Sequence, residues 1–221
     1  MFGKKTIKFM KSKVCVQYGC GFSNPKGWIN YDASPTLRLQ RIPLFGSFLK
    51  LVIKPNFPNN IHYGDIVKGL PLKPNSADLL YCSHVLEHLS HDDFEIALKN
   101  SYDCLKKGGV FRLVMPELNS LINTYIQEKN KKINEAPINF LTHSHLGVKE
   151  SRIGLINRIK ASFSNAKHQW LWDFEITKIY LEKVGFSEIR RVNYNDSEII
   201  EFNKVENSDR FKNALAIQAI K

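Results

Sequence analysis

Residues 14–21 read VCVQYGCG, a short apolar run that leads directly into a Gly-x-Gly turn. This pattern predicts a buried strand and a tight turn, and Trp28–Asp32 predicts a second apolar strand that ends in a carboxylate. Because glycine has no Cβ, backbone N–H groups in such a turn can approach a ligand closely. A carboxylate at the end of the next strand can accept hydrogen bonds from a ribose diol. The two features together predict half of a site for a nucleoside cofactor.

Further apolar runs predict an alternation of strands and helices. The strands are expected at 14–18, 28–32, 61–63, 78–83, 110–115, 188–194 and 214–220. Helical spacing of apolar residues predicts helices at 92–105 and 174–184. Such an alternation is typical of a parallel sheet in an α/β fold.

The ends of these elements carry their own signals. Asp92 or Asp93 could cap the first predicted helix, and Gly108-Gly109 is expected to end it. Only nine residues, 19–27, join the first two strands, whereas a parallel crossover usually needs a dozen or more. We therefore expect the usual first crossover helix to be short or missing.

Three further motifs follow in a fixed order. They are Tyr63-Gly-Asp-Ile66, Ser76-Ala-Asp-Leu-Leu-Tyr-Cys-Ser-His-Val-Leu-Glu-His-Leu89 and Leu105-Lys-Lys-Gly-Gly-Val-Phe-Arg-Leu-Val-Met-Pro116. With these motifs the chain resembles the class I S-adenosylmethionine-dependent methyltransferases, specifically the type 11 group. The resemblance implies an α/β fold with a doubly wound, seven-stranded, mostly parallel Rossmann-like sheet and an antiparallel final strand pair. It also implies a single methyltransferase domain over residues 1–221.

The resemblance implies S-adenosylmethionine as the cofactor and assigns its contacts to matching positions. The expected cofactor-binding residues are Gly19, Cys20 and Gly21 for the methionine part, Asp32 for the ribose, Asp65 and Ile66 for the adenine, and Ser83 and His84 near the sulfonium and ribose. Taken singly, Asp32 or Asp65 could be a turn aspartate, which is common in loops. Their places in the ordered set of motifs favour the cofactor role.

Composition and charge restrict the class of protein and its partners. The 221 residues are 43% hydrophobic and 24% charged, which is ordinary for a globular domain. No apolar run approaches the ~20 residues that span a bilayer, no apolar signal core follows the basic start, and the four cysteines form no Cys-x-x-Cys pair. We therefore expect a cytoplasmic protein with reduced thiols. The net charge of +11 favours anionic partners, although it could also serve solubility alone.

Two segments exceed the minimal scaffold. Residues 37–60 contain four basic residues and no acidic one, so the segment is either a helical cover on the sheet or a patch that contacts a membrane. Residues 117–167 lie where insertions in this fold often form the acceptor pocket, and they contain Tyr125, His143 and His145.

An oxygen acceptor must lose its proton, and histidine is the usual base at neutral pH. The candidate catalytic bases are His168, His145 and His143. The run His168-Gln-Trp-Leu-Trp-Asp173 resembles a His-x-Trp-x-x-Asp stretch of bacterial sugar-locus methyltransferases, whose tryptophans, here Trp170 and Trp172, could stack on a sugar. Alternatively, His168 only enters the last helix and Asp173 caps it. The resemblance implies a small or lipid-linked, anionic acceptor, such as a sugar hydroxyl in surface polysaccharide biosynthesis.

The spacing His84-x-x-Glu87-His88 raises the question of a metal ion. Some ubiquinone-pathway and small-RNA methyltransferases place Glu-x-x-Glu-His here to bind a divalent ion, and His143 or His145 could complete such a set. Leu-Glu-His-Leu is also widespread in metal-free type 11 members. We therefore expect Glu87 and His88 to be structural and no metal ion to be bound.

Two other classes of function stay open. The basic charge would suit a nucleic-acid methyltransferase, but no Asn-Pro-Pro-Tyr-like motif for base flipping is present. The Gln-Tyr before Gly19 and the missing crossover helix would suit a non-catalytic binding subunit with a methyltransferase fold. Failure to bind the cofactor would favour the second class.

Overall fold

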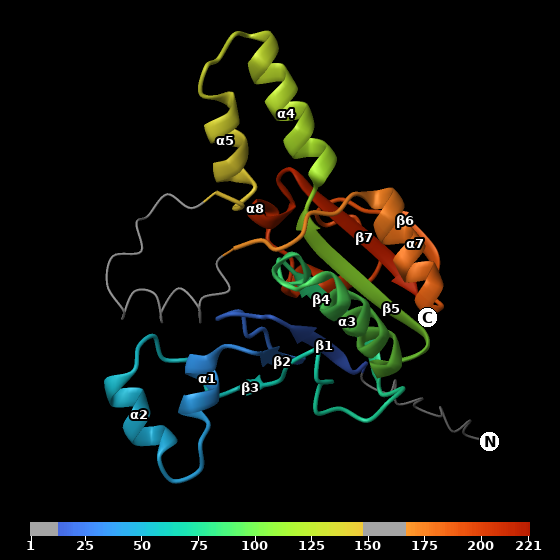
Figure 1. The fold of residues 1–221 in the computed structure, drawn as a ribbon. Helices are drawn as coiled ribbons and strands as arrows, with labels where there is room; N and C mark the ends of the chain where they lie inside the picture. Colours follow the sequence, from blue (N-terminus) through green and yellow to red (C-terminus); the bar gives the residue numbers. More distant parts are fainter. Residues whose placement is uncertain (1–12, 148–166) are drawn as a thin grey trace, which may run out of the picture.

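The computed structural model describes residues 13–147 and 167–221. Its centre is a seven-stranded sheet in the order β3-β2-β1-β4-β5-β7-β6 (Figure 1). The strands are β1 Cys15–Tyr18, β2 Trp28–Asp32, β3 Ile61–Tyr63, β4 Ala77–Ser83, β5 Leu105–Pro116, β6 Ser187–Arg191 and β7 Ala214–Ile220. Only β7 runs antiparallel to its neighbours β5 and β6. The predicted α/β fold class is therefore confirmed.

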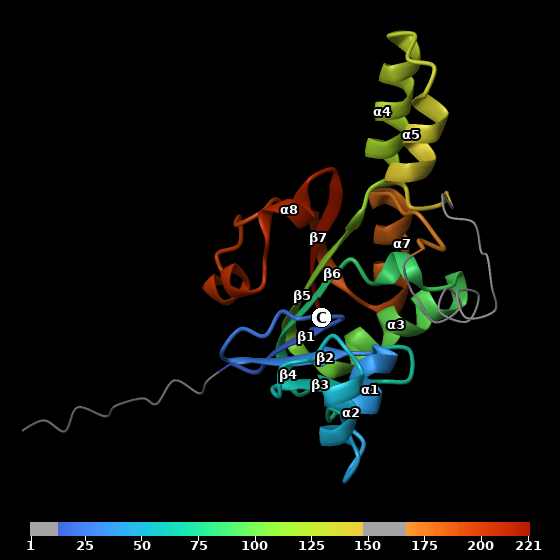
Figure 2. The same cartoon turned by 90° about the vertical axis from the view of Figure 1, so that its left-hand side faces the viewer.

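The core follows the alternation of side chains along the strands, because successive residues point to opposite faces of a sheet. Val16 of β1 packs in one cluster with Phe94 of α3 (His91–Cys104) and Leu181 of α7 (Phe174–Val184). Cys15, its neighbour in β1, packs in the other cluster with Phe202 of the 3-10 helix η2 (Ile200–Lys204). Helices α3 and α7 therefore cover one face and the η2 segment covers the other (Figure 2).

The helix ends correct part of the sequence prediction. Ser90, not Asp92 or Asp93, caps α3, and its Oγ accepts a hydrogen bond from the Asp93 N–H at 3.2 Å. The helix ends at Cys104, and Gly108-Gly109 lie inside β5. Ser90 is the cap because it directly precedes the first helical turn, so its side-chain oxygen reaches a free N–H group of that turn. Asp92 and Asp93 lie within the first turn instead.

The strand order reverses at β1, which pairs in parallel with β2 on one side and with β4 on the other. Tyr18 lies opposite Tyr31 of β2 and Cys82 of β4, so the loops after these three strands leave the sheet at one edge. No helix occurs between β1 and β2, as the short connection predicts. Ligands of open α/β sheets bind in the crevice at such a reversal.

Two helical pairs project from the sheet (Figure 1). Residues 37–60 hold most of α1 (Pro35–Gln40) and all of α2 (Gly46–Val52) beside β3. Helices α4 (Leu118–Asn130) and α5 (Ala136–His143) form a hairpin after β5. The remaining short helices are η1 (Leu86–His88) and α8 (Ser208–Phe211). Within residues 13–147 and 167–221, no helix has the length and apolar character that crossing a membrane requires.

Candidate active site

A cavity of about 900 Å³ lies at the carboxyl ends of β1 to β4. Five of the predicted cofactor-binding residues line it, namely Gly19, Asp32, Asp65, Ile66 and His84. They come from the carboxyl ends of four strands, β1 to β4, and the parallel pairing brings these ends to one edge. The cavity therefore occupies the crevice where the strand order reverses.

Gly19 allows the closest approach in this cavity. Its φ of +62° is a left-handed conformation, and a Cβ at this position would lie 2.0 Å from Val85 Cγ2. No side chain fits there without moving the loop after β4, which explains why the first turn residue is glycine. The loops after β1 and β4 therefore approach each other closely at the cavity wall.

Asp32 connects two loops through its carboxylate. Oδ2 accepts a hydrogen bond from the Gly21 N–H and Oδ1 accepts one from the Ser34 N–H, both at 2.8 Å. An ionised carboxylate offers about four acceptor positions, so both oxygens can accept further bonds from a ribose diol. Asp32 is thus oriented by the backbone in the position that the sequence predicts for ribose binding.

Asp65, which the sequence predicts for adenine binding, is also held by a backbone contact. Asp65 Oδ1 accepts a hydrogen bond from the Val67 N–H at 3.0 Å, and Oδ2 lies 3.4 Å from Lys68 Nζ. Ile66, which is buried, packs in the core beside it. The backbone contact fixes the carboxylate and leaves Lys68 as an exposed cation at the cavity wall.

Three predicted cofactor residues do not line the cavity. Cys20 is buried in a cluster with Leu37, and burial raises the pKa of its thiol to about 12. Gly21 contributes its N–H to Asp32. Ser83 ends β4 as a buried residue, and its carbonyl accepts a hydrogen bond from Arg210. Their positions support the residues that do line the cavity.

Other residues line the cavity that the sequence analysis did not select. They include Tyr63, Lys68, Val85, Asp93 and Gln169. The place of Tyr63 at the end of β3 was a usable signal, because functional side chains gather at strand ends. Gln169 carries no such signal, since only the fold brings it to η1, where its side chain donates to the His88 carbonyl at 2.7 Å.

A second cavity of about 490 Å³ lies between the sheet edge and the α4–α5 hairpin. Its lining includes polar and aromatic residues, namely Ser120, Thr124, Tyr125, Glu128, Phe140, Lys212 and Asn213. His84 lines both cavities, so the two spaces adjoin at this side chain. The predicted insertion 117–167 supplies one wall through α4 and α5; its residues 148–166 lie outside the described part of the chain.

All three candidate bases line the second cavity. The His145 and His168 rings lie 4.9 Å apart between centroids, and His143 and His145 are exposed. His168 is buried, and burial lowers its pKa although the nearby Glu87 opposes this shift. A lowered pKa keeps the His168 ring neutral at pH 7.

In the segment 168–173, Asp173 and Trp172 are structural residues, whereas Trp170 is exposed. Asp173 caps α7, because its Oδ1 accepts a hydrogen bond from the Ile176 N–H at 3.0 Å. Trp172 is a core residue that stacks on Phe94 with ring centroids 3.9 Å apart, so the prediction that it stacks on a sugar is wrong. Trp170 is exposed and lies edge-on to His91.

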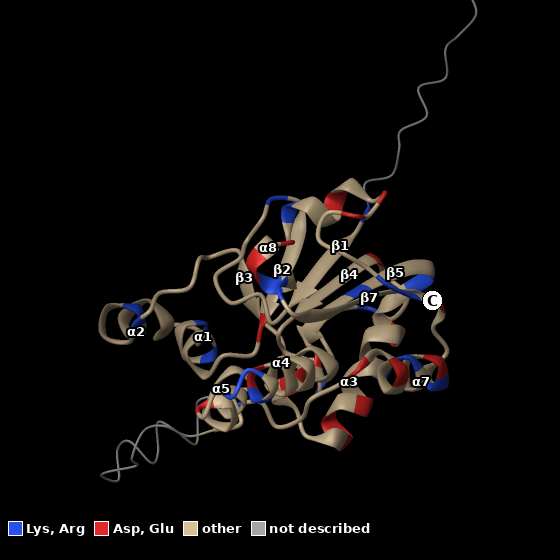
Figure 3. Cartoon of the chain, turned by 90° about the horizontal axis from the view of Figure 1, so that it is seen from above, with Lys and Arg blue, Asp and Glu red and all other residues tan. Residues whose placement is uncertain are grey.

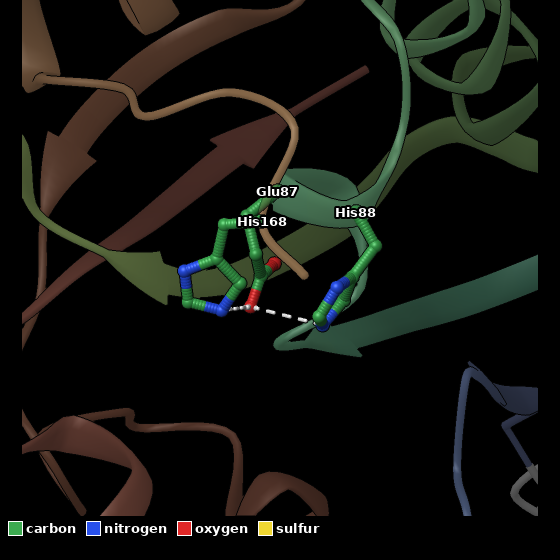
Figure 4. A group of neighbouring side chains, drawn as sticks. All are labelled: Glu87, His88 and His168. Carbon is green, nitrogen blue, oxygen red and sulfur yellow. Dashed lines mark ion pairs between the residues drawn. The ribbon is translucent and has the colours of Figure 1, made fainter. Parts of the chain in front are cut away.

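Glu87 stands at the centre of a histidine cluster (Figure 4). Its Oε1 lies 3.3 Å from His84 Nδ1, 3.9 Å from His88 Nε2 and 3.8 Å from His168 Nε2. The sequence spacing predicted that His84, Glu87 and His88 lie together. The fourth is His168 rather than His143 or His145, because the chain returns to η1 just before α7, where the Gln169 N–H bonds to the Glu87 carbonyl.

Comparisons with known proteins agree with this architecture. A family model described as a methyltransferase domain, of the type 11 group, matches residues 17–113. A methyltransferase structure from Thermotoga maritima, described as a possible histamine N-methyltransferase, is 17% identical with a TM-score of 0.50, over 96% of this chain and 84% of that one. One from Archaeoglobus fulgidus is 17% identical with a TM-score of 0.48, over 96% and 88%. No curated protein matches the sequence.

The matched domain contains the turn, the strand-end acids and the β4 loop that line the first cavity. The Thermotoga maritima structure shares the fold over nearly the whole chain. Residues 17–113 therefore carry a methyltransferase domain of the type 11 group, whose cofactor is S-adenosylmethionine.

Proposed function

We propose that this enzyme methylates a hydroxyl group of a small or lipid-linked acceptor, such as a sugar of surface polysaccharide biosynthesis, in the second cavity. The position of His84 carries the proposal, because this residue lines both cavities. Methyl transfer requires the acceptor atom in line with the methyl group at near-attack distance. Two spaces that adjoin at one side chain meet this requirement.

The proposal assigns proton removal to His145. An oxygen acceptor needs a base within hydrogen-bond reach, and neutral imidazole suits this role near pH 7. His145 is exposed at the second cavity and its ring contacts that of His168. His168 is buried behind it, and His143 lines the same cavity as the alternative base.

The shape of the acceptor side supports a molecule with a polar head and an apolar tail. A third cavity of about 270 Å³ is lined by Ile122, Tyr125, Pro137, Phe140 and Leu141. Tyr125 and Phe140 line the second cavity as well, so a polar space and an apolar one share a wall. A sugar could bind among the polar residues while an attached lipid follows the apolar ones.

Membrane contact through residues 37–60 belongs to the same proposal. Helix α2 and the turn before it expose large apolar side chains, among them Leu44 at 98%, Phe48 at 64% and Leu51 at 76%. Figure 3 shows basic but no acidic residues on α1 and α2. Exposed apolar residues with basic neighbours suit the interface of an anionic membrane, where a lipid-linked acceptor would reside.

A cytoplasmic location is also proposed. All four cysteines, Cys15, Cys20, Cys82 and Cys104, are free and buried. Free thiols are typical of a reducing compartment. Reactivity of these thiols only after unfolding, in protein purified without reductant, would support this location, whereas disulfides would contradict it.

The acceptor assignment can be tested by turnover with labelled S-adenosylmethionine and a panel of lipid-linked and free sugars. We expect His145→Ala to lower turnover about 10²–10⁴-fold. His62→Ala is the matched control, since His62 is an exposed histidine of β3 outside both cavities. Both variants should bind S-adenosylhomocysteine like the parent. Equal turnover in His145→Ala would remove it as the base, and methylation of RNA but of no sugar would refute the acceptor class.

The membrane surface can be tested by co-sedimentation with vesicles that contain anionic phospholipid. We expect the double variant Phe48→Glu, Leu51→Glu to lose binding, because two exposed apolar side chains are replaced by negative charges on a basic surface. Ile200→Glu is the control, since Ile200 is 71% exposed on the η2 side of the molecule. Equal loss in both variants, or unaffected binding in the double variant, would argue against this surface.

A further inference from the structure

Glu87, His88 and His168 bring three metal-ligating atoms together. One carboxylate oxygen and one ring nitrogen from each histidine all lie within 4.8 Å of one another (Figure 4). Glu87 and His88 belong to η1, whereas His168 comes from the segment before α7. Ligand atoms at bond lengths of about 2.0–2.2 Å lie about 3–4 Å apart in a metal site. The two distances from Glu87 Oε1, 3.9 and 3.8 Å, already fall in that range.

The buried carboxylate of Glu87 lacks hydrogen-bond donors among the described residues. Its side chain is 1% exposed, and neither oxygen has a hydrogen-bond partner among the described residues. A buried ionised carboxylate without hydrogen bonds is costly unless a cation compensates it. No lysine or arginine pairs with Glu87 in the described part of the chain; the groups that face it are imidazoles.

The outer nitrogens of two of these imidazoles are already engaged. His88 Nδ1 lies 2.9 Å from the Lys167 carbonyl, and His84 Nε2 lies 2.9 Å from the Arg210 carbonyl. A carbonyl only accepts, so each of these nitrogens carries the proton and donates. In the neutral ring the other nitrogen then has a free lone pair, and it faces the Glu87 carboxylate. Metal-binding histidines are oriented by such outer hydrogen bonds.

From this arrangement we propose that Glu87, His88 and His168 bind one divalent first-row transition ion, with zinc as the ion to test first. A cation between these atoms would satisfy lone pairs that otherwise oppose one another. Two imidazoles and one carboxylate suit zinc, manganese or iron(II) better than magnesium, which prefers oxygen ligands. Three protein ligands also leave a position for a further ligand.

The location gives the ion a role that rests on the proposed function. His88 lines the cofactor cavity and His168 lines the acceptor cavity, so the open position adjoins both. An acceptor hydroxyl bound there has a lowered pKa and loses its proton more readily. The proton passes to His145, the O–CH₃ bond forms and the S–CH₃ bond breaks, which leaves S-adenosylhomocysteine.

Metal binding can be measured without any acceptor. The untagged, chelator-treated protein is titrated with zinc chloride by calorimetry. We expect one ion per chain and a loss of at least about 100-fold in affinity for Glu87→Gln and for His168→Ala. His62→Ala should bind zinc like the parent. S-adenosylhomocysteine binding checks that each variant is folded.

The outcomes separate the two proposals. The metal site would be overturned if a parent protein that binds S-adenosylhomocysteine bound neither zinc nor manganese nor iron(II). Zinc binding by folded Glu87→Gln and His168→Ala equal to that of the parent would overturn it as well. Zinc binding at one equivalent that both substitutions abolish would support the site even if sugars are not methylated, a result that would refute only the proposed acceptor.

Discussion

Two glutamates of this methyltransferase, Glu206 and Glu87, are equally buried but differently compensated. Glu206 pairs with the buried guanidinium of Arg112 and accepts a hydrogen bond from the Asn195 N–H at 2.8 Å. Glu87 faces three imidazole nitrogens between 3.3 and 3.9 Å away and has no hydrogen bond among the described residues. The first arrangement is complete as it stands and serves the fold. The second has no cationic partner among the described residues, and the histidines around it line the two cavities, which is typical of a functional site.

The largest effect is expected from breaking the complete pair. Arg112→Met removes a cation with no exposed surface and leaves Glu206 buried without its partner. Unpaired buried charges cost about 3–5 kcal/mol of the free energy of unfolding. Urea denaturation followed by circular dichroism measures this loss. A change below about 1 kcal/mol would show that the pair contributes little, in contrast to the usual cost of an orphaned buried charge.

A third carboxylate extends the comparison, because Asp32 pairs with no cation among the described residues and yet has hydrogen bonds. Two backbone N–H groups orient it at the cofactor cavity. We expect Asp32→Ala to weaken S-adenosylmethionine binding by about 1.5–3 kcal/mol, the cost of a lost hydrogen bond to a charged group. Calorimetric titration checks this, with Asp92→Ala as the control because Asp92 is exposed and outside the cavity. Unchanged affinity in folded Asp32→Ala would remove the ribose role.

The stability that Arg112 and its two carboxylate partners, Glu206 and Asp196, give the fold should also depend on pH. Burial alone would raise the pKa of Asp196, but hydrogen bonds from the Asn193 N–H and from Arg112 outweigh it and lower that pKa. A carboxyl with a lowered pKa in the folded state adds stability above its unfolded pKa, and this stability is lost as pH falls through the folded pKa. Asp196→Asn should therefore cost about 1 kcal/mol at pH 7 and less below pH of about 3. Unfolding measured across this pH range tests the convergence, which a pH-independent difference would contradict.

The smallest effect is expected at Glu87 in metal-free protein. Glu87→Gln removes a buried carboxylate that no hydrogen bond from the described part of the chain compensates, so the free energy of unfolding should stay within about 1 kcal/mol or rise. The same substitution at Glu206 should be strongly destabilising, since it removes the fully buried carboxylate from Arg112 and leaves only the more exposed Asp196 as its ion-pair partner. Denaturation of both variants in the presence of a chelator makes the comparison. Equal destabilisation would mean that Glu87 is as well compensated as Glu206.

The cofactor half of the molecule was largely predictable from local patterns. Gly19, Asp65 and His84 lie one or two residues beyond a predicted strand, Asp32 is the last residue of one, and parallel pairing brings such strand ends to one edge. Cys20 and Ser83 were placed at the same edge, but they are buried rather than exposed to the cavity. Strand alternation and packing decide which way a side chain points, and the motif alone does not contain that information.

By itself the sequence determined the order of strands and helices, the methyltransferase motifs and the basic, apolar character of α2, because these follow from local periodicity and composition. The tertiary structure decided which distant groups meet. It brought His168 from the segment before α7 to Glu87 in η1, and it buried Trp172 against Phe94. It also paired Arg112 of β5 with Glu206. Contacts between residues this far apart in the sequence depend on how the whole chain packs, so short-range patterns predict the elements but not these partners.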